Sequence, residues 1–259
     1  MMNLKILNKN LFSDFVQKID FSILEIIEKL EQKEISFDYY KTNYAISSVF
    51  SSKIEGEEIE LDSFFKHKFL EVKFLPDYTK RTDDLFSAYE FMQENILNLR
   101  HILEAHSILS ENLLPKFQRG KVRQNQMMIV NNDGKIEYVA ADKSLVENEL
   151  EKLFEDIDNL MSEDLSLEEI FYFASQIHLV FVKIHPFEDG NGRSARLLEK
   201  WFLKEFLGRK AFAVQLEKNY YKNLQNYYKN LKKIGIEYLD LDYNKSLDFL
   251  LMTVNSLKA

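Results

Sequence analysis

The chain has 259 residues, which is enough for one large domain or for a main domain with a smaller appendage. Its 34 basic and 42 acidic residues give a formal net charge of −8. This balance argues against a large nucleic-acid surface, because phosphate backbones are bound by clustered Lys and Arg. No cysteine is present, so disulfides and cysteine-ligated zinc are excluded.

Targeting signals are not evident. The first residues, MMNLKILNKNLFSDF, lack the apolar core of a signal peptide. The longest apolar-looking segment, 171–184, is too short to span a bilayer and includes His178 and Lys183. We therefore expect a cytoplasmic protein that binds neither membranes nor nucleic acid.

Apolar residues recur at helical spacing, and helix breakers are scarce, with 7 glycines and 3 prolines. The sequence therefore predicts an all-α helical bundle. A cap at Asp62 is expected to start a short helix, and Asp164 or Ser166 is expected to cap the helix predicted over 166–184. Apart from the short helix, the predicted helices, in chain order, span 12–33, 37–55, 82–106, 107–117, 144–161, 166–184, 192–207, 217–233 and 243–257.

One segment departs from the helical pattern. Residues 125–141, NQMMIVNNDGKIEYVAA, alternate around Asn132-Asp133-Gly134. Asp-Gly between β-forming flanks is a hairpin signal. We expect a single β-hairpin over 126–140 that protrudes from the bundle.

The segment KIHPFEDGNGRSARLLEKWF, 183–202, concentrates residues that are rare elsewhere in the chain. Pro186 should end the preceding helix, and a new helix should begin near Arg193. A glycine-containing turn at a helix N-terminus exposes backbone N–H groups at the positive end of the helix dipole, which favours phosphate. Gly190 and Gly192 allow positive φ and close approach of a ligand.

Charged side chains extend this predicted anion site. Arg193 and Arg196 are three residues apart, so their guanidinium groups can hold more than one phosphate. Glu188 and Asp189 are the nearest carboxylates, and a carboxylate beside bound phosphates is the usual partner of Mg²⁺. His185 stands at the loop entrance, where an imidazole can act as a general base.

Other residues of this region are assigned to the core. Phe187 is interpreted as the anchor of the loop, and His178 as a buried histidine with satisfied hydrogen bonds. His67, His101 and His106 show no ligand spacing, so we assign them no function.

The string at 185–196 resembles the Fic family signature, HxFx(D/E)GNGRxxR, at every motif position. The resemblance implies the Fic fold, a helical bundle with a β-hairpin flap. It also implies a protein adenylyltransferase, which moves AMP from ATP to a Ser, Thr or Tyr hydroxyl of a target protein. In that reaction His185 deprotonates the target hydroxyl, and Asp189 holds Mg²⁺, with Mn²⁺ as an alternative, on the α- and β-phosphates.

The resemblance assigns the remaining motif residues to the nucleotide. Gly190, Asn191 and Gly192 form the anion hole. Arg193 contacts the phosphate chain, and Arg196 reaches the γ-phosphate. This division of roles suits a reaction that depends on positioning and charge neutralisation.

A second match lies upstream, where SSKIEG resembles the family's autoinhibitory motif, (S/T)xxxE(G/N). Ser51 and Glu55 share a helix face, and Gly56 is a common residue past a helix end. The resemblance implies that Glu55 pairs with Arg196, so that ATP binds in a non-productive pose. It places the chain in the branch whose inhibitory helix, here about 37–56, is N-terminal.

The resemblance also concerns substrate contacts. It implies that the 126–140 hairpin pairs with an extended segment of a target protein, whose identity is unknown. A tyrosine-bearing helix after the motif contributes to the nucleotide pocket, and an aromatic face can stack on adenine. Tyr228 is our candidate, although the sequence leaves open which of Tyr220, Tyr221, Tyr227 and Tyr228 faces inward.

The resemblance covers roughly 80–235, the predicted Fic core. Residues 1–79 would form an N-terminal helical region, and 236–259 a C-terminal helix packed on the core. Family members often assemble, so a homo-oligomer is expected. Three alternatives stay open: removal of AMP from a target, phosphoryl or other nucleotidyl transfer, and a non-enzymatic module that only binds ATP.

Overall fold

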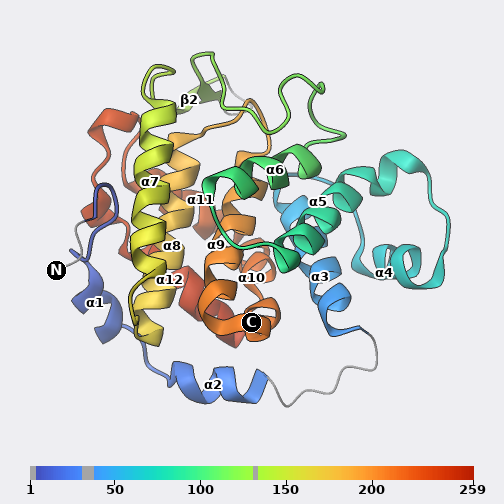
Figure 1. The fold of residues 1–259 in the computed structure, drawn as a ribbon, viewed down its shortest axis with the longest axis horizontal. Coiled ribbons are helices and arrows are strands. Elements are labelled where there is room, and N and C mark those ends of the chain that lie inside the picture. Colours follow the sequence, from blue (N-terminus) through green and yellow to red (C-terminus); the bar gives the residue numbers. More distant parts are fainter. Residues whose placement is uncertain (1–3, 31–37, 131–133) are drawn as a thin grey trace.

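The computed structural model describes residues 4–30, 38–130 and 134–259, and within them the fold is a helical bundle with one two-stranded sheet (Figure 1). The predicted fold class is thus confirmed. The α-helices are α1 (Phe12–Gln17), α2 (Ile23–Leu30), α3 (Tyr39–Ile54), α4 (Leu61–Leu70), α5 (Pro76–Glu94), α6 (Leu99–Leu109), α7 (Val146–Met161), α8 (Leu167–Ile184), α9 (Asn191–Leu207), α10 (Leu216–Lys222), α11 (Leu224–Lys233) and α12 (Leu247–Asn255). Short 3₁₀ segments are η1 (Gly208–Ala213), η2 (Tyr238–Asp240), η3 (Tyr243–Lys245) and η4 (Ser256–Lys258).

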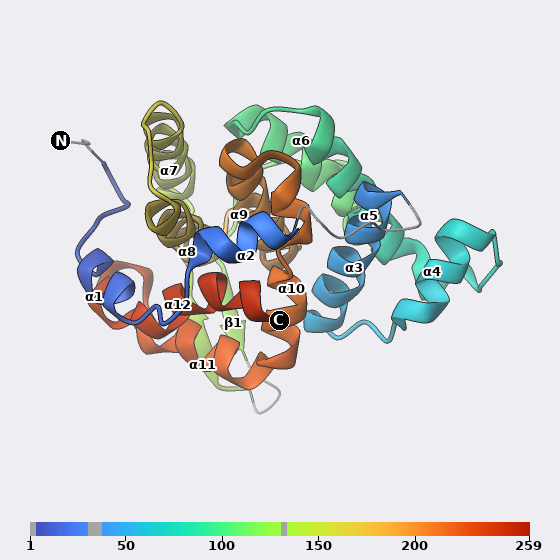
Figure 2. The ribbon, with the colours of Figure 1, turned by 90° about the horizontal axis from the view of Figure 1, so that it is seen from below.

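Helix α8 is the centre of the bundle. It is apolar on nearly every side, and a helix with this composition has to be buried. It packs against α7, α9 and α12, and Figures 1 and 2 show α7 and α9 on different sides of it. Its start is a capping box: the Ser166 hydroxyl accepts from the Glu169 N–H, and the Glu169 carboxylate accepts from the Ser166 N–H. Ser166, rather than Asp164, is therefore the cap.

The hairpin forms where the alternating pattern predicts it. Strand β1 (Met128–Val130) pairs with β2 (Ile136–Val139) in antiparallel fashion, with Ile129 opposite Tyr138. Gly134 has a φ of 74°, as a residue of a tight hairpin connection requires. Asn132 and Asp133, the other predicted turn residues, lie outside the described residues.

Several predicted helices are shorter or divided. The predicted helix over 82–106 is two helices, because the Asn98 side chain accepts from the His101 N–H and so caps a new one, α6. The predicted helix over 217–233 is likewise divided, at Asn223, into α10 and α11. Both breaks fall at asparagine, whose side chain bonds to nearby backbone and competes with helix continuation.

Three further boundaries were predicted wrongly. The helix expected over 12–33 is divided into α1 and α2, and 31–33 lie outside the described residues. The residues after Leu109 form turns instead of the helix expected over 107–117. Asp62 lies in the first turn of α4 and does not cap it, since Glu60 holds the cap position.

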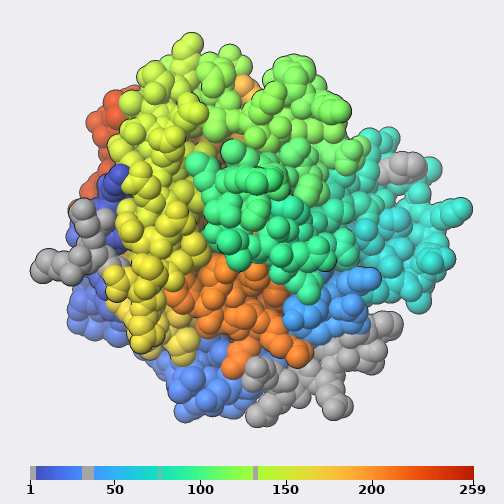
Figure 3. Space-filling model, viewed as in Figure 1, coloured from blue at the N-terminus to red at the C-terminus, as the bar shows by residue number. Residues whose placement is uncertain are grey.

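One continuous hydrophobic core includes residues from the start, middle and end of the chain, among them Tyr44, Phe173 and Phe249. Helix α3 packs against α5, α9 and α10, so the N-terminal region is part of this core. In Figure 3, α7 and the segment around α6 form much of one face. The boundaries proposed at 79 and 235 stay a prediction.

Replacing Ser166 tests the importance of the α8 cap. We expect Ser166→Ala to lower the free energy of unfolding by about 1 kcal/mol, because it removes one half of the capping box. Urea denaturation measures the change. Ser166→Thr keeps the hydroxyl and is the control, so equal losses in both variants would contradict the capping role.

Candidate active site

The loop between α8 and α9 is shaped by two left-handed residues. His185 ends α8 with a φ of 56°, and Gly190 precedes α9 with a φ of 79°. A positive φ is costly for a residue with a side chain, so it persists at His185 only because neighbouring groups fix it. Gly190 could not be replaced cheaply, since an added Cβ would lie 3.2 Å from Leu109 Cδ1.

The Asn191 side chain closes the loop. Its Oδ1 accepts from the Phe187 N–H and its Nδ2 donates to the Phe187 carbonyl, both at 2.8 Å. The amide group is therefore oriented by the loop, and its second Nδ2 hydrogen and the backbone N–H are the donors that Asn191 has left for an anion. Phe187 is fully buried, which confirms its predicted role as the loop anchor.

His106, to which the sequence analysis assigned no function, supports this loop from behind. Its Nδ1 accepts from the Gly120 N–H at 2.9 Å, so its Nε2 carries the proton and donates to the Asp189 carbonyl at 3.0 Å. The ring also stacks on Phe187, with 3.6 Å between centroids. Burial lowers the pKa of His106 to about 4, which keeps it in this neutral form.

His185 is prepared to accept a proton. Its Nδ1 lies 3.2 Å from the Val182 carbonyl, which can only accept, so Nδ1 carries the proton and Nε2 has a free lone pair. Burial is the main cause that lowers the pKa of His185 to about 4. The imidazole is therefore neutral at physiological pH, as a general base must be.

The start of α9 offers unsatisfied donors. The first N–H groups of a helix have no partner within it, and no side chain caps this helix. Gly192 lies in this first turn, and a Cβ added to it would meet Glu55 Oε1 at 2.5 Å. The Glu55 carboxylate therefore occupies the space directly beside the turn that we predict to bind phosphate.

Arg196 is fully buried and is held by α3. Its Nε donates to Ser51 Oγ at 2.8 Å, and its Nη2 donates to Glu55 Oε1 at 2.6 Å. Burial alone would raise the pKa of Glu55, but the charges of Arg196 and Arg193 outweigh it and lower that pKa below its usual range. Gly56 follows with a φ of 88°, the geometry of a residue just past a helix end.

Arg193 pairs with a carboxylate that the sequence analysis did not consider. Its Nη2 lies 3.1 Å from Glu57 Oε1, and the same oxygen accepts from Arg81 Nη1 at 2.8 Å. The buried Nε of Arg193 has no hydrogen-bond partner. The sequence analysis missed Glu57. The signal that could have identified it is its position two residues after Glu55, the glutamate of the motif.

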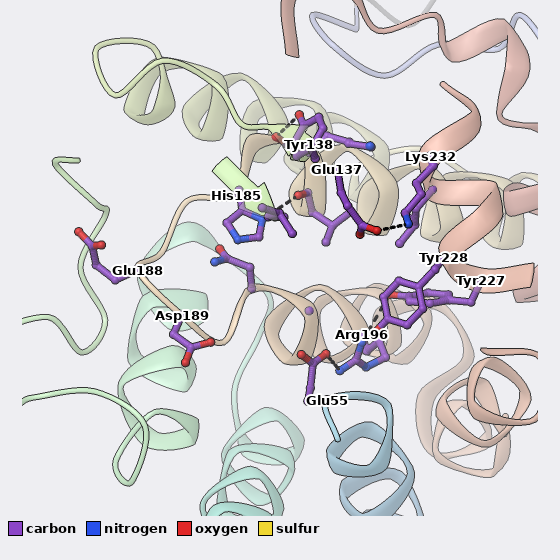
Figure 4. A pocket seen from close by; sticks show the side chains of 16 residues that line it. Glu55, Glu137, Tyr138, His185, Glu188, Asp189, Arg196, Tyr227, Tyr228 and Lys232 are labelled. Atoms are coloured by element: carbon purple, nitrogen blue, oxygen red, sulfur yellow. Dashed lines mark hydrogen bonds and ion pairs between the residues drawn. The ribbon is translucent and has the colours of Figure 1, made fainter. Parts of the chain in front are cut away.

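A cavity of about 330 Å³ brings most of the predicted site residues together (Figure 4). Four of the predicted site residues do not line the cavity: Ser51, Gly56, Gly190 and Arg193. Glu55 and Arg196 form one side of it, and Glu137 with Lys232 the opposite side. The lining consists of Glu55, Ile129, Glu137, Tyr138, Val182, Lys183, His185, Glu188, Asp189, Asn191, Gly192, Arg196, Tyr227, Tyr228, Leu231 and Lys232.

The tertiary structure decides which tyrosines face the cavity. Tyr227 and Tyr228 both line it, whereas Tyr220 is buried behind them and donates to Glu199. Tyr227 also accepts from Arg196 Nη1 at 3.4 Å and approaches His178 Nε2 at 3.0 Å. The second nitrogen of His178 pairs with Glu199, so the prediction of a satisfied core histidine is confirmed.

One carboxylate is available for a metal ion. Asp189 is exposed at the cavity wall, and its Oδ1 accepts only from the Gly190 N–H, at 2.6 Å. Glu188 instead accepts from Asn125 Nδ2. The described residues contain no group of three or more His, Cys, Asp or Glu that could hold a metal. A single carboxylate suits Mg²⁺, which takes its other ligands from water and phosphate oxygens.

No helix among the described residues is both long and apolar enough to cross a membrane.

The family model that matches the chain is that of the Fic/DOC family, over residues 96–203. A protein adenylyltransferase, fic-1 of Caenorhabditis briggsae, is 34% identical over 119 residues, which are 43% of this chain and 22% of that protein. The chain therefore spans less than a quarter of this relative.

Solved structures share the fold. A Fic family protein from Desulfovibrio desulfuricans G20 superposes with a TM-score of 0.77 at 20% identity, over 99% of this chain and 74% of the other. Fic-1 (residues 134–508) of C. elegans superposes with a TM-score of 0.65 at 17% identity, over 96% and 71% respectively. At these identities the likeness shows the fold alone, and it agrees with the predicted bundle and hairpin.

Gly190→Ala tests the packing of the loop. We expect it to lower the free energy of unfolding by about 1–3 kcal/mol, because a left-handed φ and a close contact with Leu109 act together. Thermal or urea unfolding measures the loss. Gly134→Ala is the matched control, since Gly134 also has a positive φ but an added Cβ would meet nothing within 4 Å. Equal losses would show that the contact is unimportant.

Proposed function

We propose that the chain, whose residues 96–203 match the Fic/DOC family model, is a protein adenylyltransferase. The reaction moves AMP from ATP to a Ser, Thr or Tyr hydroxyl of a target protein. One observation carries the proposal: a single cavity contains an imidazole with a free Nε2, an uncapped helix N-terminus and an exposed carboxylate.

The chemistry follows from these groups. Nε2 of His185 takes the proton of the target hydroxyl, and the hydroxyl oxygen forms a bond to the α-phosphorus of ATP. The bond from that phosphorus to the bridging oxygen breaks, and pyrophosphate leaves with the negative charge. The free N–H groups at the start of α9 stabilise this charge, as preorganised donors do in a dry site.

Asp189 is the residue that would hold Mg²⁺, or Mn²⁺ in its place, together with the phosphate oxygens of ATP. The metal ion supplies charge neutralisation and orientation of the phosphates when bound. Tyr228 is the residue we assign to the adenine, because its ring lines the cavity beyond Arg196. The phosphates would then extend toward the loop.

The protein is proposed to be autoinhibited by Glu55. The carboxylate pairs with Arg196, the residue assigned to the γ-phosphate, and fills the space beside Gly192. A buried guanidinium cannot serve both anions in full, so ATP has to displace Glu55 or bind without this contact. Helix α3 would thus be the N-terminal inhibitory helix.

The target protein is proposed to bind through the hairpin. Ile129 and Tyr138 line the cavity beside His185, so the hairpin borders the place where the hydroxyl must arrive. An extended target segment would add to the sheet edge by backbone hydrogen bonds. Cytoplasmic location and assembly into a homo-oligomer remain part of this proposal.

We expect Glu55→Gly to increase labelling of protein by ATP labelled at the α-phosphate by about tenfold or more, since it frees Arg196. Adding His185→Ala should abolish this labelling. Mass spectrometry should find AMP on the modified residue, and a phosphate-sized shift would instead indicate phosphoryl transfer. Glu58→Gly, which changes an exposed nearby acid, is the control. Full labelling by the double variant would exclude His185 as the base.

Removal of AMP by the same site is a second candidate. The Glu55 side chain is 31% exposed at the cavity edge and its lowered pKa keeps it ionised, so it can orient a water molecule. Protein labelled by the Glu55→Gly variant should therefore lose AMP when wild-type protein and Mg²⁺ are added. The Glu55→Gly variant itself should release none. Absence of release by the wild type would leave transfer as the only reaction.

A further inference from the structure

Arg123 is a buried cation whose side-chain partners are all carbonyl groups. It is 1% exposed, and within 4–30, 38–130 and 134–259 it forms no ion pair with a carboxylate. Its Nε donates to the His185 carbonyl at 2.7 Å, and its Nη2 approaches the Ile184 carbonyl at 3.4 Å. Burying a guanidinium group without an acidic partner costs free energy unless its N–H groups are hydrogen-bonded. Moving these carbonyls away from Arg123 would therefore also cost free energy.

The same guanidinium binds both stems of the hairpin. Its Nη1 donates to the Asn125 carbonyl, before β1, and its Nη2 to the Ala141 carbonyl, after β2, both at 2.5 Å. One planar group therefore connects the two ends of the flap to the backbone of His185. A lysine could not do this, because only guanidinium presents a rigid fork of donors.

Other contacts complete the connection between the flap and the end of α8. The Tyr138 hydroxyl donates to the Lys183 carbonyl at 2.6 Å, and the Arg123 N–H donates to the Pro186 carbonyl at 2.9 Å. Carbonyls at a helix C-terminus have no partner within the helix. Here Tyr138 of the flap and Arg123 together supply partners to four successive carbonyls, at 183–186.

We propose that Arg123 is a positioning residue that couples the hairpin flap to His185. It keeps a target segment bound on the flap in register with the imidazole Nε2. The left-handed backbone of His185 aims its side chain, and Arg123 holds the carbonyl of that same residue. The inference rests on the proposed function, because it takes His185 as the base and the hairpin as the target-binding element.

The coupling predicts a split between binding and turnover. None of the side-chain donors of Arg123 contacts the α9 turn, Arg196 or Glu55, so the nucleotide site does not depend on it directly. Loss of the guanidinium should leave ATP affinity nearly unchanged and slow the transfer step. A residue needed only for stability would not separate these two quantities.

The test uses the full chain with Glu55→Gly as the parent, to which Arg123→Ala or Arg123→Lys is added. Arg100→Ala is the matched control, because Arg100 is exposed and pairs only with Glu104. Calorimetry with ATP and Mg²⁺ measures affinity, and self-labelling by α-labelled ATP measures turnover. Hydrogen exchange of the segments 123–141 and 181–188 measures coupling without any need for activity.

We expect Arg123→Ala to lower turnover about 100-fold, because a small misplacement of reacting groups can slow a reaction by that much. ATP affinity should change less than about threefold. Added guanidinium ion should restore part of the turnover in Arg123→Ala but not change the control. Exchange should rise in both segments together. Arg123→Lys keeps the positive charge but lacks the forked donors of guanidinium, so it should behave like Arg123→Ala. It replaces the alanine variant in the test if that variant does not fold.

Three results would overturn the inference. They are unchanged turnover in the folded variants, faster exchange in the flap with full protection at 181–188, and equal losses of affinity and turnover. If the Glu55→Gly parent labels nothing, the proposed function fails, and the exchange experiment still decides whether Arg123 couples the two segments.

Discussion

The site depends on one physical constraint, which is that the guanidinium of Arg196 is fully buried and must have an anionic or polar partner. In this structure Ser51 and Glu55 provide it, so the end of α3 is fixed beside the first turn of α9. An uncompensated buried charge would be strongly destabilising. Any anion that enters the cavity therefore competes with Glu55 for the same cation.

The rest of α3 is anchored more deeply. Ser47, one helical turn before Ser51, accepts from Lys200 Nζ at 2.6 Å, and Lys200 pairs with the buried Glu217 at 2.7 Å. Arg196 and Lys200 are also one turn apart, so two facing stripes join α3 to α9. Under the proposed autoinhibition, release would need movement of the Glu55 side chain only, because these contacts hold the rest of the helix in place.

The loop between α8 and α9 is also held in place by side-chain contacts. His106 binds the Asp189 carbonyl and stacks on Phe187, while Asn191 joins the two ends of the loop. These contacts leave the N–H groups of the turn and Nε2 of His185 directed to the cavity. Preorganisation of this kind is what transition-state stabilisation requires, because the donors need not reorganise during reaction.

The sequence by itself indicated the helical class, the hairpin, the loop at 185–196 and the SSKIEG segment proposed to be inhibitory, since each depends on local periodicity or on residues adjacent in the chain. It failed at Asn98 and Asn223, where a polar side chain divides a continuous apolar pattern. It left open which tyrosine faces the cavity, because each of Tyr220, Tyr221, Tyr227 and Tyr228 could equally pack in the core.

Only the tertiary structure decided the parts played by Glu57, His106 and Arg123. Their partners lie far along the chain: Arg123 binds the carbonyl of His185, and Glu57 binds Arg193. Such contacts involve backbone carbonyls or ion pairs between distant residues, and neither leaves a periodic pattern in the residues. A sequence shows which groups can hydrogen-bond, but packing alone brings a donor and a distant carbonyl within 3 Å of each other.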